Sequence, residues 1–130
     1  MTHREIAEKL RNNPNGPTNC GQTVLMTFAE ELGLSQEQAK KMGTNFGGGM
    51  LCGSTCGTLT SGMMVLGGLG VSPRMSAQFI KRFKELHETT ECAVLLAKSR
   101  EAGIAKKNHC DGLVYDAIDT IDAILKEAGM

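Results

Sequence analysis

Apolar residues recur at helical spacing along most of the chain, and polar or glycine-rich segments separate these recurrences. Two stretches show the pattern most clearly. Within 19–32, an apolar residue stands at every fourth position: Cys20, Val24, Phe28 and Leu32. Within 110–126, the inward positions are Val114, Ile118, Ile121 and Leu125, and the outward positions are Asp116, Asp119 and Asp122. This spacing predicts two helices with one buried face each.

Turn and capping signals delimit further helices. The polar Pro- and Gly-containing run 12–17 ends a first helix over 4–11, and Gly33 ends the second. Ser35 with Gln38 forms a capping box for a helix over 36–44. Ser72-Pro73 begins another helix, whose buried face is expected at Met75, Phe79, Phe83 and Leu86. A short helix over 91–98 and a polar connector over 99–107 are also predicted.

The segment 54–66 is apolar or small on every side, so we expect it to form a central, buried helix. It follows a glycine triplet at 47–49 and precedes the glycine-rich stretch 67–70. No β-hairpin signal appears anywhere. The sequence therefore predicts one all-α domain over residues 1–130, a bundle of about six to seven helices around a buried Gly/Met-rich helix.

Composition narrows the function class. The chain has 14 basic and 14 acidic residues, one Tyr and no Trp, and no basic stripe, so we expect no nucleic-acid partner. Its longest apolar run is too short to span a bilayer, and its first residues lack a signal-peptide pattern. We therefore expect a cytoplasmic protein with reduced thiols. The apolar central helix and the eight Met indicate a possible homodimer or docking surface.

Four of the five cysteines follow Ser, Thr or Asn residues at predicted helix starts: Cys20, Cys56, Cys92 and Cys110. A helix start favours a thiolate over a thiol. If the four starts converge, they form a redox or metal site; otherwise the cysteines are small core residues. They are separated by 35, 35 and 17 intervening residues, which matches no standard zinc-finger or ferredoxin spacing.

The remaining cysteine, Cys52, stands four residues before Cys56. If this segment is helical, both thiols face one metal ion or one disulfide partner. If Gly53 keeps it irregular, backbone N–H groups face a sulfide or another anion instead. Downstream, His109 with Lys106 and Lys107 either lowers the pKa of the Cys110 thiol or forms a solvated loop.

Several of these segments together resemble the C_GCAxxG_C_C family of redox-active proteins. They are Asn19-Cys20, Phe46-Gly47-Gly48-Gly49-Met50, Cys52-Gly53-Ser54-Thr55-Cys56-Gly57, Met64-Val65-Leu66-Gly67, Cys92 and Cys110. The resemblance covers about 17–125. One departure is that the family's Cys-Gly-Ala-x-x-Gly reads Cys56-Gly57-Thr58-Leu59-Thr60-Ser61 here, followed by Gly62. The hydroxyls of Thr58 and Ser61 are therefore candidate donors to a sulfur.

The resemblance implies four functional cysteines: Cys20, Cys56, Cys92 and Cys110. It also implies an anaerobe-associated, often transporter-linked redox role. A similar module is part of the split-Soret cytochromes, where its cysteines are thought to hold an iron–sulfur centre. The present chain has no Cys-x-x-Cys-His motif, so a haem role does not carry over.

The leading hypothesis is a small redox protein that transfers electrons to or from a partner protein. An iron–sulfur cluster, most simply [2Fe–2S], would be held by the same four cysteines, with Gly53, Gly57 and Thr58 beside it. The first alternative is a metal-free thiol–disulfide protein, with Cys56 as nucleophile and Cys52 or Cys20 as the resolving thiol. The second is a zinc- or copper(I)-thiolate module.

Overall fold

The computed structural model describes all 130 residues and contains eight α-helices and no strand. The helices are α1 (His3–Arg11), α2 (Cys20–Thr27), α3 (Ala29–Leu32), α4 (Gln36–Gly43), α5 (Gly57–Gly68), α6 (Pro73–His87), α7 (Cys92–Glu101) and α8 (Lys106–Glu127). Two short turns, η1 (Thr44–Phe46) and η2 (Gly49–Gly53), connect α4 to α5. A single antiparallel bridge pairs Thr55 with Glu91. The all-α prediction is confirmed.

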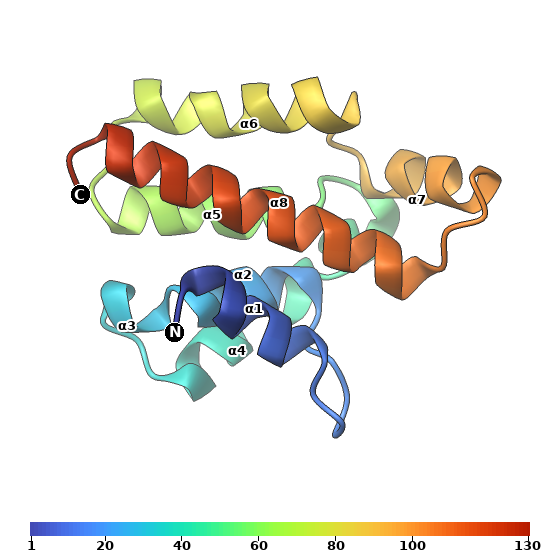
Figure 1. The fold of residues 1–130 in the computed structure, drawn as a ribbon, viewed down its shortest axis with the longest axis horizontal. Helices are drawn as coiled ribbons and strands as arrows, with labels where there is room; N and C mark the ends of the chain where they lie inside the picture. The colour runs from blue at the N-terminus through green and yellow to red at the C-terminus, as the bar shows by residue number, and fades with distance from the viewer.

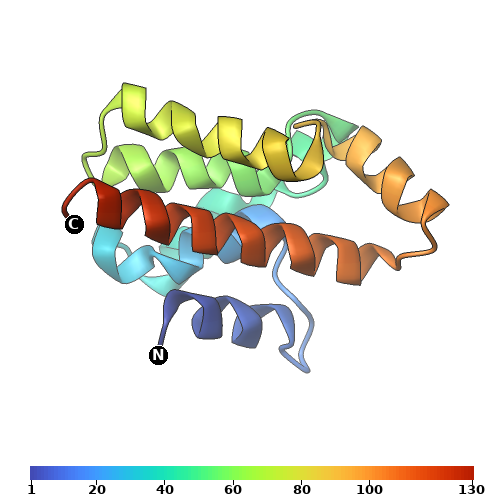
Figure 2. The same ribbon diagram turned by 45° about the horizontal axis from the view of Figure 1, so that its top comes forward.

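Helix α8 runs the length of the molecule and organises the other helices (Figure 1). It packs against α1, α5 and α6, while α2 lies between α4 and α5. Figure 2 shows α7 and the η2 turn together at one end and the C-terminus at the other. None of the helices is both long enough and apolar enough to cross a membrane.

One hydrophobic cluster of 23 buried residues joins the helices. Its largest fully buried side chains include Phe28 of the α2–α3 junction and Phe79 of α6. As predicted, α5 is central, because it packs against α2, α6 and α8. Small residues allow this: a Cβ on Gly62 would lie 2.3 Å from the Cε2 atom of Phe79. The inward face predicted for 110–126 is buried as expected.

Several predicted helix boundaries are corrected by the structure. The segment 99–107 is mostly helical rather than a connector, because α7 continues to Glu101 and α8 begins at Lys106. Gly103, with a φ of 76°, makes the only sharp break there. No Pro or Gly follows it before Cys110, so α8 forms one turn earlier than predicted. Cys110 therefore lies in the second turn of α8 and not at a helix start.

The face of α6 also departs from prediction at its end. Phe79 and Phe83 are buried, whereas Leu86 is 60% exposed. His87, four residues after Phe83, faces inward instead, and the two ring centroids lie 4.7 Å apart. The i, i+4 neighbour therefore continues the buried face, and the i, i+3 neighbour turns to solvent.

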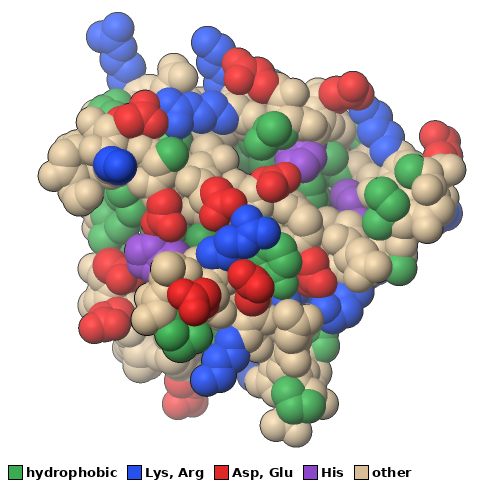
Figure 3. Space-filling model, in the orientation of Figure 1, with side chains coloured by type: hydrophobic (Ala, Val, Ile, Leu, Met, Phe, Trp, Pro, Cys, Tyr) green, Lys and Arg blue, Asp and Glu red, His purple; other side chains and the backbone are tan.

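The acidic positions of α8 are ion-paired and not simply solvated. Asp119 lies 2.6 Å from Nη1 of Arg4, and Asp122 lies 2.6 Å from Nδ1 of His3. Both pairs fasten α1 to α8. Figure 3 shows acidic and basic side chains interspersed over this face, with no region of a single sign.

Candidate functional site

Cys20 is the first residue of α2, as the capping signal predicted. Asn19 forms the N-cap, with its side chain accepting a hydrogen bond of 2.7 Å from the Gln22 N–H. The Gln22 side chain returns a bond of 3.0 Å to the Asn19 N–H. This capping box fixes the backbone that carries Cys20, whose side chain is nearly buried at 9% exposure.

Cys56 lies directly against Cys20. It occupies the position before α5, and its N–H donates to the Thr90 carbonyl at 2.8 Å. Its thiol lies close enough to the Cys20 sulfur for each group to shift the pKa of the other. The Thr58 hydroxyl is hydrogen-bonded to the Cys56 sulfur at 3.1 Å. Thr58 thus contacts a sulfur as predicted, whereas the buried Ser61 hydroxyl has no partner.

The pair is electrostatically asymmetric. The pKa of Cys20 is lowered to about 6, mainly by its interaction with the Cys56 thiol. The backbone N–H groups of Gly21, Gly57 and Gly48 lower it further, and together these effects exceed the rise in pKa that burial causes. The interaction with Cys20, together with burial, raises the pKa of Cys56 well above the ordinary thiol range. The pair therefore holds one thiolate and one proton near neutral pH, with the charge on Cys20.

A left-handed turn supplies part of this environment. Gly48, Gly49, Met50 and Leu51 all have φ between 61° and 64°. For a non-glycine residue this conformation costs about 1–2 kcal/mol. The turn is closed by hydrogen bonds of 3.0 Å from Leu51 N–H to the Gly47 carbonyl and 2.8 Å from Ser54 N–H to the Gly49 carbonyl. The segment around Cys52 is accordingly irregular, which was one of the two alternatives.

Glycines let the chain approach the sulfurs closely. A Cβ on Gly57 would lie 2.0 Å from the Phe46 carbonyl oxygen and 2.7 Å from the Cys20 sulfur. A Cβ on Gly49 would lie 2.6 Å from that of Cys92. The N–H of Gly57 faces the Cys20 sulfur. The N–H of Gly53 does not face a sulfur, because it donates to the Gly48 carbonyl at 2.9 Å.

Cys92 and Cys110 lie near the pair without joining it. Burial is the main cause that raises the pKa of both thiols, and the negative charge of Cys20 raises it further. Cys92 begins α7 as predicted. Of the two alternatives for the basic residues around His109, a lowered pKa of Cys110 is not found, because Arg11 and Lys106 oppose burial only in part. A loop is not found either, because Lys106, Lys107 and His109 belong to α8. His109 instead contacts Ser99 through Nδ1.

Cys52 stands apart, with an exposed side chain whose sulfur donates to the Gly49 carbonyl at 3.6 Å. None of the five cysteines forms a disulfide in this structure. No group of three or more His, Cys, Asp or Glu side chains is placed to hold one metal ion. The donor chemistry suits an iron–sulfur cluster, but only Cys20 and Cys56 are in contact, so the thiols do not enclose one as they stand.

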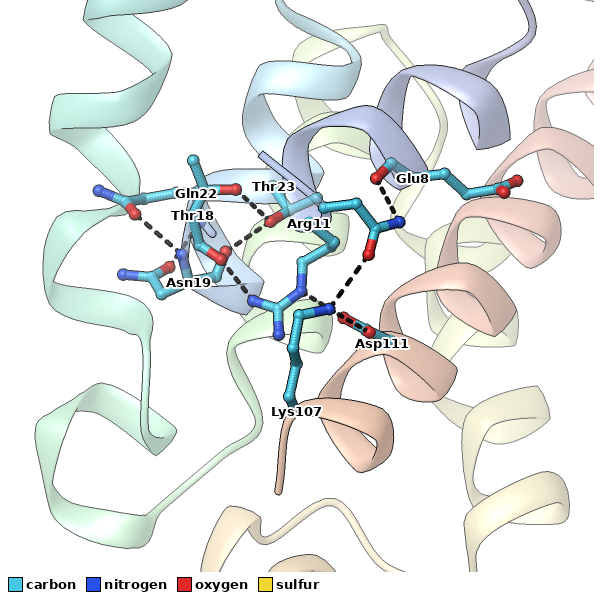
Figure 4. Close-up of polar contacts among 9 residues, drawn as sticks. Glu8, Arg11, Thr18, Asn19, Gln22, Thr23, Lys107 and Asp111 are labelled. Carbon is cyan, nitrogen blue, oxygen red and sulfur yellow. Dashed lines mark hydrogen bonds and ion pairs between the residues drawn. The ribbon is translucent and has the colours of Figure 1, made fainter. Parts of the chain in front are cut away.

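Sequence reasoning missed a basic network next to Cys20. Arg11 is only 5% exposed, and its guanidinium donates to the Thr18 carbonyl and, at 2.7 Å, to Asp111 (Figure 4). Lys107 also contacts Asp111, at 2.7 Å. One feature of the sequence could have indicated that Arg11 is buried. Arg11 stands four residues after the buried Ala7 and therefore shares its face of the helix.

Comparison with known proteins agrees with the cysteine pattern. No curated protein and no solved structure gives a significant match. Residues 18–124 match the sequence profile of a family described as "Putative redox-active protein (C_GCAxxG_C_C)". The match covers most of the chain and includes all five cysteines. The chain therefore belongs to the C_GCAxxG_C_C family of redox-active proteins.

Proposed function

We propose that this protein performs thiol–disulfide exchange and that Cys20 and Cys56 are its reacting groups. The observation that carries the proposal is the close approach of these two buried cysteines, each of which shifts the pKa of the other. Three backbone N–H groups also converge on the Cys20 sulfur and stabilise its thiolate. A thiolate in contact with a second thiol is suited to forming a disulfide with it.

The reaction follows from the asymmetry of the pair. The Cys20 thiolate attacks one sulfur of a disulfide oxidant, forming a mixed disulfide and releasing one thiolate. Cys56 gives its proton to that thiolate and attacks the Cys20 sulfur, which releases the second thiolate and leaves a Cys20–Cys56 disulfide. The protein loses two electrons, the oxidant gains two, and a dithiol partner protein returns them in the reverse exchange.

Cys20 is the nucleophile and Cys56 the resolving thiol, whereas the sequence alone favoured Cys56 as the nucleophile. Cys56 is 2% exposed and keeps its proton, whereas Cys20 lines a cavity and carries the charge. Because the lower-pKa, better-approached sulfur reacts first, Cys20 is the point of entry.

The test is disulfide mapping on protein purified without oxygen and equilibrated in glutathione buffers of stepped potential. After alkylation and digestion, we expect the oxidised form to contain a Cys20–Cys56 linked peptide that disappears as the buffer becomes more reducing. The Cys52→Ser variant is the matched control and should keep the linkage. Failure to detect that peptide at any potential, with both cysteines alkylated throughout, would overturn the proposal.

A second candidate is electron transfer by an iron–sulfur cluster held by Cys20, Cys56, Cys92 and Cys110. It is favoured by one observation: the charge of Cys20 acts on both Cys92 and Cys110, so the four thiols share one electrostatic neighbourhood. A bound cluster would supply one-electron transfer, and the N–H groups facing Cys20 would stabilise its negative charge.

Iron, acid-labile sulfide and the absorption spectrum of the same anaerobic preparation separate the two candidates. Iron and sulfide lost in Cys92→Ser and Cys110→Ser would support the cluster, because disulfide exchange needs neither residue. Colourless, iron-free protein that resists anaerobic reconstitution would reject it. Stoichiometric zinc or copper without iron would support a metal–thiolate module and count against both candidates.

A further inference from the structure

A basic cavity opens beside the Cys20–Cys56 pair. Its volume is about 330 Å³, and its lining includes Cys20, Cys110 and Gly48 together with Arg11, Lys106 and Lys107. No Asp or Glu lines it. The volume suits a small molecule, and the presence of Cys20 places that molecule next to the proposed nucleophile.

The cations of the cavity are incompletely neutralised. Arg11 and Lys107 share the single carboxylate of Asp111 (Figure 4). Lys106 makes no ion pair, although its charge acts on Cys92 and Cys110. A positive potential in a partly enclosed cavity attracts anions.

Hydrogen-bonding groups in the wall add to this preference. The Thr18 carbonyl accepts from Arg11, and the Thr18 hydroxyl is bonded to that of Thr23 at 2.7 Å. Lys106 and Lys107 are the first two residues of α8, whose start has no side-chain cap. The wall thus offers donors to a ligand while its main acceptors are already engaged.

We propose that this cavity binds a low-molecular-weight anionic disulfide, with carboxylate groups of the substrate against Lys106 and the start of α8. The inference rests on the proposed function and adds its substrate class. Seating the carboxylates there brings the substrate's sulfur–sulfur bond toward Cys20, where the exchange described above begins. Lys106 acts as a specificity residue in this account, because it contacts the substrate's charge and not its sulfurs.

The test compares two disulfides of opposite charge: glutathione disulfide, which is anionic, and cystamine, which is cationic. The rate at which Cys20 loses its free thiol, whether as a mixed disulfide or as the Cys20–Cys56 disulfide that resolves it, is followed by alkylation and peptide mass spectrometry. In the unaltered protein, glutathione disulfide should react faster than cystamine. Lys106→Glu should lower the ratio of the two rates by about tenfold or more, and added salt should reduce the preference.

Lys126→Glu, at the opposite end of α8, makes the same change in net charge and should leave the ratio unchanged. A ratio below one in the unaltered protein, or a ratio that Lys106→Glu does not change, would overturn this inference while leaving thiol exchange intact. If neither reagent modifies Cys20 although the exposed Cys52 reacts, the proposed function itself fails, and the substrate assignment fails with it.

Discussion

Two regions of this molecule, the helical scaffold and the cysteine site, are built on opposite principles. Along α1 and α8, ordinary helical backbone is reinforced by a capping box at Thr2 and by ion pairs such as Arg4–Asp119. At the cysteine end, four successive residues adopt positive φ, including Met50 and Leu51. Non-glycine residues persist in that conformation only where the surrounding structure enforces it. The scaffold is stabilised locally, whereas the cysteine site is held in place by its contacts.

The glycines of α5 show the same contrast within one helix. Gly57, at the cysteine end, has no room for a side chain, while a Cβ on Gly67 would meet nothing within 4 Å. Gly57 is therefore required by its surroundings and Gly67 is not. Substitutions at these two positions should therefore have opposite effects on stability.

Gly57→Ala is expected to have the largest effect. The new Cβ must displace the Phe46 carbonyl and the Cys20 sulfur, so the free energy of unfolding should fall by about 3 kcal/mol or more. Gly67→Ala removes a flexible residue from a helix and should raise it by about 0.5–1 kcal/mol. Urea denaturation measures both. Equal effects at the two glycines would contradict the account.

Cys56→Ala should shift the ionisation of Cys20 strongly. Without the Cys56 thiol, the pKa of Cys20 should rise from about 6 toward the unfolded value of about 9. Cys56→Ser keeps a donor and should show a smaller rise. The measurement is thiolate ultraviolet absorbance against pH. An unchanged titration in Cys56→Ala would show that Cys56 does not stabilise the thiolate.

This ionisation also makes stability depend on pH. Because the pKa of Cys20 is lower in the folded protein than in the unfolded chain, its contribution is full above the unfolded value of about 9. It decreases as pH falls and is lost below about 6. As pH increases from about 6 to about 9, the free energy of unfolding of the unaltered protein should therefore rise relative to that of Cys20→Ser. If the difference between the two proteins stays constant over this range, the folded protein does not hold a thiolate at Cys20.

Leu51→Gly should stabilise the protein by about 1 kcal/mol, because glycine adopts positive φ without the steric cost. Leu86→Gly is the matched substitution in the scaffold. Leu86 is also exposed, but it lies within α6, so glycine there should destabilise by about 1 kcal/mol. Thermal unfolding of both variants gives the sign of each effect. A stability change of the same sign in both variants would contradict the distinction between the cysteine site and the helical scaffold.

The smallest effect is expected at His3. Burial lowers its pKa, but hydrogen bonds to Glu31 and Asp122 and their charges outweigh burial, so the pKa is raised. Its contribution to stability is thus full below about 6.5 and is lost as pH rises through the folded pKa. His3→Gln should destabilise the protein slightly more at low pH than at high pH in denaturant titrations.

Most of the scaffold could be predicted from sequence, because local patterns determine it. Three features show this: the capping box at Ser35, the helix start at Pro73 and the inward face of α8. Each is determined by residues only a few positions apart in the sequence. The start of α8 was misplaced because Asn108 resembles a cap, while the chain already turns helical after Ala105.

The cysteine site was predictable in composition but not in arrangement. The cysteines, Gly57 and Thr58 were identifiable as candidates from their residue types and neighbours. That Cys20 meets Cys56, and that Gly48 faces the same sulfur, depends on how α2 crosses α5 and on a left-handed turn. Arg11 is held beside the cysteine site by its contacts with Thr18 and Asp111, and Asp111 is 100 residues away in sequence. Local patterns contain no information on such contacts.

The most direct test of the account is the pH dependence of alkylation at each cysteine in protein purified without oxygen. Iodoacetamide labelling with peptide mass spectrometry resolves the individual sites. The account predicts that labelling of Cys20 is half-maximal near pH 6, while Cys56 stays unreactive through pH 9. Labelling of Cys56 at lower pH than Cys20, or a Cys20 midpoint near the ordinary thiol value, would contradict it.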